Sequence, residues 1–175
     1  MSSANLAVWV GKNEAWIRIG GRANFASSPE FQTLLEKLLQ KGYGRFKIEL
    51  EKCVLMDSTF LGVLAGFGMK LNPDGKNSNG CVELINVNDR VRELLENLGA
   101  ANLFKITIGE VTLPGGMAPA PCDPEPSQPT HEQITRTSLE AHKTLMKIAP
   151  ENIERFKDVT QFLAEDLQNL QNSSE

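Results

Sequence analysis

The chain has 175 residues, of which 41% are hydrophobic, and its formal net charge is −4. This is the composition of a globular protein, and the mildly acidic balance gives no electrostatic reason to expect a nucleic acid partner. Uncharged apolar stretches are too short to span a bilayer, and no secretion signal is recognisable, so we expect a cytoplasmic protein. Three widely spaced cysteines, Cys53, Cys81 and Cys122, predict reduced thiols rather than a disulfide framework or a metal site.

Strand and helix patterns alternate over the first 112 residues. β-rich runs predict strands over 6–10, 16–19, 45–50, 81–87 and 104–108, and a short apolar strand directly before Asp57. Helical spacing of apolar residues predicts three helices, which begin at Ser28, Ser58 and Asn88 and end at Gly42, the NPDG turn after Leu71, and Gly99. Ser28 is the expected amino-terminal cap of the first helix, with Pro29 in its first turn.

The strand over 45–50 shows the clearest alternation. Its odd-numbered and even-numbered positions differ in polarity, with Phe46, Ile48 and Leu50 on one face and Arg45, Lys47 and Glu49 on the other. This pattern predicts one buried and one exposed face. Because single helices separate most strands, parallel pairing is favoured, while the opening hairpin makes the sheet mixed. We therefore expect an α/β domain over residues 1–112, a mixed β-sheet with packed helices.

The last third of the chain has a different character. Residues 113–130 contain six prolines and no apolar periodicity, which predicts a semi-rigid linker. Thr130 and Gln133 form a capping box that starts a helix, and Pro150 separates it from a second helix. We expect residues 131–175 to be a C-terminal α-helical extension, a helical hairpin whose apolar stripes pair with each other and, in a homodimer, with a second copy.

The stretch MDSTFLGVLAG, residues 56–66, places polar side chains where a strand gives way to a helix. Asp57, Ser58 and Thr59 are all residue types that cap helices, so capping alone is one interpretation. The other is that Ser58 accepts a phosphate, because a helix start tolerates negative charge. Thr59 is expected to be a capping or buried hydroxyl.

These residues and their order resemble the STAS domain, and more narrowly the bacterial anti-sigma factor antagonists. The motif is similar to the family signature Met-Asp-Ser-[Ser/Thr]-Gly-Leu-Gly. Gly20 and Gly21 end the second strand as in that family, and VNDRVRELLENLGAANLFKI, residues 87–106, resembles its closing helix, turn and strand. The resemblance covers residues 5–112 and leaves the C-terminal third unexplained.

The resemblance implies a binding protein rather than an enzyme, without cofactor or metal. In that family, the serine after the motif aspartate is phosphorylated by an anti-sigma factor, a GHKL-type serine kinase, and dephosphorylated by a PP2C-type phosphatase. The resemblance implies that Ser58 is the corresponding site in this chain. The unphosphorylated antagonist binds the anti-sigma factor and so releases a sigma factor for transcription. The expected partner-binding residues lie around this serine: Asp57, Thr59, Phe60, Gly62, Val63 and Asn24.

Two positions depart from the family pattern: Phe60 replaces a glycine, and Asn24 replaces an aspartate. These departures bear on which kinase recognises the chain. They leave a second function open, an interaction scaffold without phosphorylation, in a signalling assembly or as a transporter accessory subunit.

The helix after Ser58 has a wide apolar arc, which indicates core packing or, alternatively, an exposed anchor at Phe60, Val63 or Phe67. His131 and His142 are eleven residues apart, without a paired histidine or cysteine at ligand spacing. We expect both to lie on solvated helix faces. Catalytic pairs are not recognisable from spacing.

Overall fold

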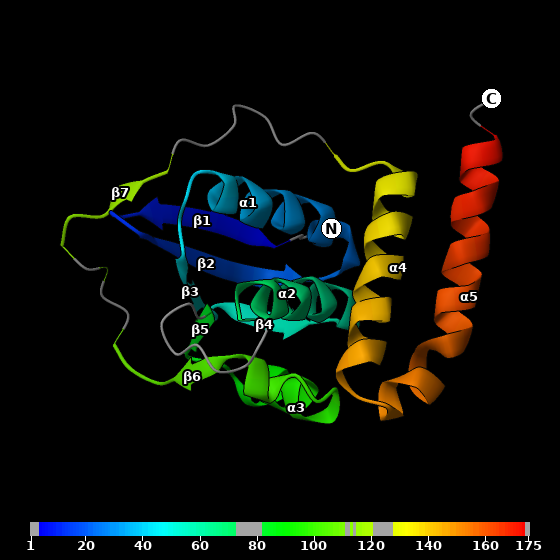
Figure 1. The fold of residues 1–175 in the computed structure, drawn as a ribbon. Coiled ribbons are helices and arrows are strands. Elements are labelled where there is room, and N and C mark those ends of the chain that lie inside the picture. Colours follow the sequence, from blue (N-terminus) through cyan, green and yellow to red (C-terminus); the bar gives the residue numbers. More distant parts are fainter. Residues whose placement is uncertain (1–3, 73–81, 111–112, 114, 121–127, 174–175) are drawn as a thin grey trace.

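The computed structural model describes residues 4–72, 82–110, 113, 115–120 and 128–173. Among them, a sheet carries helices, and two long helices stand side by side at one end (Figure 1). The strands are β1 (Asn5–Val10), β2 (Glu14–Ala23), β3 (Arg45–Glu49), β4 (Cys53–Met56), β5 (Val82–Ile85), β6 (Lys105–Thr107) and β7 (Ala118–Pro119). The helices are α1 (Ser28–Gln40), α2 (Ser58–Leu71), α3 (Asp89–Asn97), α4 (His131–Ile148) and α5 (Glu151–Asn172).

The sheet is mixed, as predicted. Its strand order is β6-β5-β3-β2-β1-β7, and β4 pairs with β2 beside this path. The pairs from β2 through β3 and β5 to β6 are parallel, whereas β1 is antiparallel to both β2 and β7. The strand β7 comes from the proline-rich segment and has only two residues, too few for any periodicity to reveal it.

The core lies between the sheet and α1 and α2. The buried face of β3 carries Phe46 and Ile48, as its alternation predicts. Phe31 of α1 stacks on Phe60 of α2 with ring centroids 4.4 Å apart, and Phe46 meets the edge of Phe67 at 4.7 Å. Burying one such side chain stabilises the fold by roughly 1.5–3 kcal/mol, so these rings fix where α2 lies on the sheet.

The other face of β3 is not fully exposed, and here the prediction from alternation was wrong. Glu49 is 1% exposed, and its carboxylate accepts a hydrogen bond from Nε of Arg18 at 2.6 Å. Arg18 lies directly opposite Glu49 in the parallel register of β2 and β3. Because the charge is neutralised by a neighbouring strand, a carboxylate can be buried at a position that alternation marks as exposed.

The helix caps follow the sequence at two of three places. Asn88 caps α3 by accepting from the Val91 N–H, and the Thr130–Gln133 capping box opens α4, as predicted. Ser28 is not the cap of α1, because it is already the first helical residue and its hydroxyl donates to the Asn24 carbonyl at 3.0 Å. The preceding polar residue, Ser27, occupies the cap position without a side-chain capping bond.

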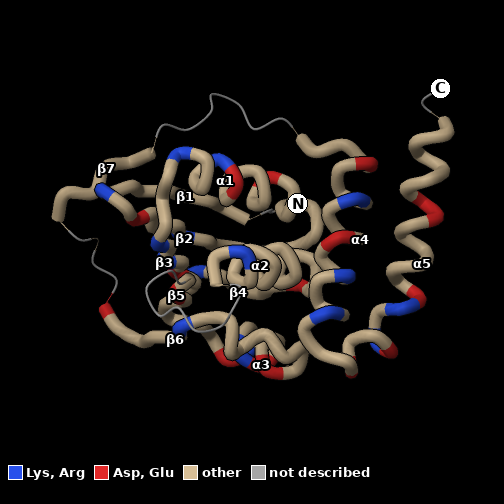
Figure 2. Tube along the Cα trace, viewed as in Figure 1, with Lys and Arg blue, Asp and Glu red and all other residues tan. Residues whose placement is uncertain are grey.

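Some expectations fall outside the described residues. The residues that the structure does not describe include Cys81, Cys122 and most of the NPDG turn. Cys53 lies in the described part and is a buried free thiol. In the described part of the chain, Lys and Arg are interspersed with Asp and Glu over the helices and strands (Figure 2). This mixing is consistent with the weakly acidic composition of the chain.

The two C-terminal helices form a hairpin that lies against the rest of the structure. Figure 1 shows α4 between α5 and α2, so one side of α4 pairs with α5 and the other covers the sheet-bound helix. The predicted stripe of α5 is only partly buried, since Phe156 and Thr160 are buried while Ile153 is 45% exposed. The expected homodimer stays a prediction.

A buried asparagine at the start of α5 ties this hairpin to α3. Asn152 is 0% exposed, and its side-chain amide donates to the carbonyls of Leu98 at 2.9 Å and Leu145 at 2.7 Å. Nearby, Arg155 donates to the Asn97 carbonyl at 3.1 Å. The turn of the hairpin is therefore fixed at the carboxyl end of α3 as well as along α2.

Replacing this asparagine tests the anchor. Asn152→Ala should lower the free energy of unfolding by about 1–3 kcal/mol, because two buried carbonyls lose their donor. Urea denaturation followed by circular dichroism measures it. The exposed Asn169 of the same helix gives the control, Asn169→Ala, with an expected change within about 0.5 kcal/mol. Equal effects of the two substitutions would contradict the anchor.

Candidate functional site

The start of α2 is organised by a single carboxylate. Asp57 is the amino-terminal cap of the helix, and its Oδ1 accepts from the Phe60 N–H at 2.9 Å. Its Oδ2 accepts from the Phe25 N–H at 2.7 Å, from the short 3₁₀ turn Phe25–Ser27. Both oxygens are thus held by backbone donors from two segments, which fixes the loop after β2 against the beginning of α2.

The surroundings of this carboxylate oppose its charge. Desolvation by burial raises the pKa of Asp57 above its ordinary value, and this outweighs the N–H donors of Phe60 and Phe25 and the nearby His142, which lower it. Asp57 is half-buried.

Ser58, the first residue of α2, has a histidine as its side-chain partner. Its Oγ lies 2.9 Å from Nε2 of His142 in α4, and Nδ1 of the same ring lies 2.7 Å from the Ser138 carbonyl. A carbonyl only accepts, so Nδ1 carries the proton, and in the neutral ring Nε2 accepts from the Ser58 hydroxyl. The half-buried serine is therefore held by a residue 84 positions away in the sequence.

The expectation that His142 lies on a solvated helix face was wrong. The ring is 5% exposed, and Phe156 of α5 meets it edge-on with ring centroids 4.8 Å apart. It is buried because α4 is covered on both sides, by α2 and α5. His131, by contrast, is exposed and lies 3.2 Å from Asp166. Among the described residues, no cluster of three metal-ligating side chains occurs.

The other residues named from the sequence fall into two groups. Asn24 lies between Ala23 and Phe25, whose backbone groups are both hydrogen-bonded to Asp57, and the Asn24 side chain accepts from the Ser27 N–H at 3.3 Å. Thr59 is buried, and Phe60 is 0% exposed in its stack with Phe31. Of the two expectations for Phe60, core packing rather than an exposed anchor is therefore the one that this structure shows. The aromatic ring that replaces the family glycine does not reach the surface.

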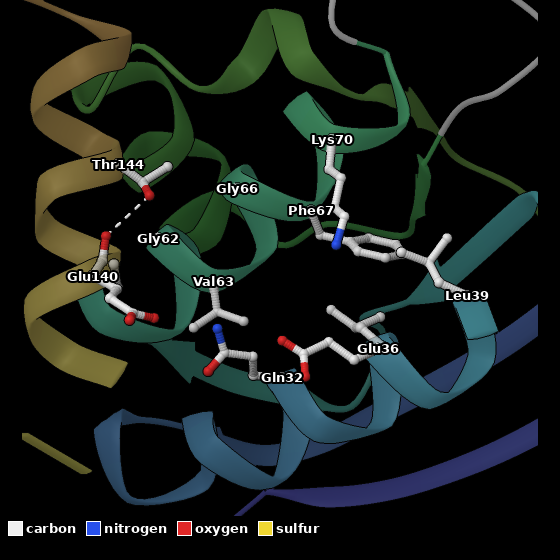
Figure 3. A pocket seen from close by; sticks show the side chains of 12 residues that line it. Gln32, Glu36, Leu39, Gly62, Val63, Gly66, Phe67, Lys70, Glu140 and Thr144 are labelled. Carbon is white, nitrogen blue, oxygen red and sulfur yellow. Dashed lines mark hydrogen bonds between the residues drawn. The ribbon is translucent and has the colours of Figure 1, made fainter. Parts of the chain in front are cut away.

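Gly62 faces α4, whereas Val63 points into a groove beside it. A Cβ atom placed on Gly62 would lie 2.5 Å from the carbonyl oxygen of Ala141, so only glycine permits this helix contact. Val63 lines a groove of about 190 Å³ between α1, α2 and α4, shown in Figure 3. Its rim includes Gln32 and Glu36 from α1 and Lys70 from α2, so its lining is mixed rather than apolar.

Comparison with known proteins identifies the domain that carries this site. A family model described as the STAS domain matches residues 10–111, more than half of the chain. The chain belongs to the STAS domain family. The match includes Asp57 and Ser58 and stops before α4, so His142 lies outside the part that defines the family.

Relatives within the STAS family include named regulators. An anti-sigma-B factor antagonist of Staphylococcus aureus is 29% identical over 93 residues, which cover 53% of this chain and 82% of that protein. A Staphylococcus epidermidis protein of the same name is 27% identical over the same length. A crystal structure of a candidate anti-sigma factor antagonist from Thermotoga maritima aligns with a TM-score of 0.53, 19% identity, and coverage of 61% of this chain and 87% of that chain. This structure supports the STAS fold that the sequence predicted.

In the described part of this STAS protein, none of the helices combines the length and apolar character needed to cross a bilayer.

The double role of Asp57 can be separated by substitution. Asp57→Asn should keep the hydrogen bond from the Phe60 N–H but place the side-chain NH2 group, a donor, opposite the Phe25 N–H, which then has no acceptor. The substitution should therefore lower the free energy of unfolding by about 1–3 kcal/mol. Asp57→Ala removes both acceptors and should cost more. Chemical denaturation measures these changes against the exposed helix-start control Asp89→Asn. An Asp57→Asn protein as stable as wild type would contradict the role of Phe25.

The raised pKa of Asp57 predicts a sign for the pH dependence. In the folded state this carboxyl holds its proton to higher pH than its ordinary value of 3.8, so folding is favoured more by the protonated form. The stability of wild type relative to Asp57→Asn should therefore fall as the pH rises from about 4. Urea titrations at several pH values measure it, and a relative stability that rises over this range would contradict the assignment.

Proposed function

We propose that this STAS protein is an anti-sigma factor antagonist whose binding is controlled by phosphorylation of Ser58. The observation that carries the proposal is the position of Ser58, at the first helical residue after the capping Asp57, within the domain shared with named antagonists. The proposed partner is an anti-sigma factor that is a GHKL-type serine kinase, with a PP2C-type phosphatase reversing the modification. The protein is then a cytoplasmic binding protein rather than an enzyme.

The geometry supports control without unfolding. At the first turn of a helix, unpaired N–H groups and the helix dipole favour an added anion, so the α2 start tolerates a phosphate. A partner lying on the same surface instead meets a charge of roughly −1.5 to −2 next to the carboxylate of Asp57. Repulsion and desolvation of a few kcal/mol at a contact change affinity by orders of magnitude.

A second function, a STAS scaffold without phosphorylation, is favoured by one observation. The Ser58 hydroxyl is already hydrogen-bonded to His142, and α4 covers the face of α2 beside it. A serine that is permanently held in this way serves structure alone. The two functions differ in whether the hydroxyl is ever modified.

Phosphorylation by a purified kinase separates these functions. The probes are the anti-sigma factors with a GHKL-type kinase domain encoded in the same genome, each incubated with the full chain and ATP. Mass spectrometry should find one phosphate on wild type and on Thr59→Ala, and none on Ser58→Ala. A PP2C-type phosphatase should remove it. Phosphate retained on Ser58→Ala would contradict the site, and an unmodified wild type with every kinase would favour the scaffold.

Binding gives the second test of the same proposal. Ser58→Asp should weaken binding to the anti-sigma factor by roughly 10-fold or more, because it mimics part of the phosphate charge. The matched control is Ser173→Asp at the exposed end of α5, which adds the same charge away from the site. Calorimetry with the purified anti-sigma factor measures both. Unchanged affinity of Ser58→Asp would contradict a charge-controlled surface.

A further inference from the structure

The contact between α4 and α2 is unusually close at Gly62. Any Cβ at Gly62 would lie 2.5 Å from the Ala141 carbonyl oxygen and 2.6 Å from the Ala141 Cβ. One turn further on, a Cβ at Gly66 would lie 3.5 Å from Cγ2 of Thr144. Small residues on both helices thus form a fitted seam, and a helix is what this face of α2 accepts.

Polar contacts fix the position of α4 at both ends of this seam. Ser58 Oγ at the start of α2 lies 2.9 Å from Nε2 of His142, and Asn152 donates to the carbonyls of Leu98 and Leu145 where the hairpin turns. The docking of α4 is therefore specific in register. It also places a buried ring directly on the hydroxyl that the proposed function assigns to phosphorylation.

The buried surface of α4 is unlike that of a permanent core helix. Besides Leu139, Ala141 and Leu145, it buries four polar side chains: Thr137, Ser138, His142, and Thr135, whose hydroxyl donates to Asp166 of α5 rather than toward α2. Polar groups regain hydrogen bonds to water when they are exposed. Undocking a helix with such a face therefore exposes less apolar surface, and costs less free energy, than undocking a helix whose buried face is wholly aliphatic. The seam combines a specific fit with a surface that tolerates solvent, as expected of an interface that opens.

We propose that α4 and α5 are a built-in ligand of the α2 face, which occupies the anti-sigma factor site until it is displaced. This inference rests on the proposed function, because it assigns the same face to a partner. In the closed form, Ser58 and Gly62 both face α4, so α4 keeps a partner or a kinase active site away from this surface. The closed form is thus both unable to bind and protected from phosphorylation.

Tethering makes this competition effective. A ligand on the same chain acts at an effective concentration of about millimolar, so a weak seam still competes with a separate protein. The apparent dissociation constant for the partner rises by the inverse of the open fraction. A chain that is open about one tenth of the time thus binds about 10-fold more weakly than a chain held open.

Opening the seam from the α4 side is the first arm of the test. Ala141→Leu places a branched side chain where the helices are closest, and it should raise affinity for the anti-sigma factor and the rate of Ser58 phosphorylation by about 10-fold. The matched control is Ala164→Leu on the exposed side of α5, for which no change is expected. Neither alanine belongs to the STAS match.

Locking the seam is the second arm, and it works in the opposite direction. Gly66→Cys with Thr144→Cys, in full-length protein that also carries Cys81→Ser and Cys122→Ser, places two sulfurs across the seam. The oxidised protein should bind the anti-sigma factor at least 10-fold more weakly than the same protein after reduction. This arm does not depend on whether Ala141→Leu folds well, because the reduced form of the same molecule is its control.

The outcomes separate this inference from the proposed function. If the oxidised and reduced forms bind equally, and Ala141→Leu matches wild type, the built-in ligand is wrong while the antagonist function stands. If neither wild type, Ala141→Leu nor the reduced protein binds any GHKL-type anti-sigma factor, the proposed function fails, and the inference fails with it.

Discussion

The close contact between α4 and α2 is the constraint on which the rest of this structure depends. Gly62 lets the backbone of α4 approach until Ala141 fills the space of a side chain, and this approach brings His142 to Ser58. Without glycine at that position the helices would separate, and the hydrogen bond of 2.9 Å could not form. A steric feature of one residue thus determines the chemical surroundings of another.

The site combines a rigid part with a removable part. Asp57 joins α2 to the loop after β2 through two backbone donors, and the Phe31–Phe60 stack fixes α2 on the core. These contacts belong to the STAS domain, and none of them involves α4. The hairpin contributes the cover, through His142. A fixed helix start with a removable cover is the arrangement that a switch by binding requires.

Sequence patterns predicted what local chemistry determines. They predicted the mixed sheet, the caps at Asn88 and Thr130, and the polar motif at the start of α2. They failed where a distant residue decides: Glu49 is buried because Arg18 lies opposite on another strand, and His142 because α4 lies between α2 and α5. The sequence also did not indicate that another helix of the same chain approaches Gly62.

Hydrogen–deuterium exchange of the full chain, alone and bound to its anti-sigma factor, tests the central claim most directly. The amides of α4 should exchange slowly in the free protein and become markedly faster in the complex, while those of the sheet stay protected. If α4 remained equally protected in a saturated complex, the partner would bind elsewhere, and the account of α4 as a displaceable cover of Ser58 would be contradicted.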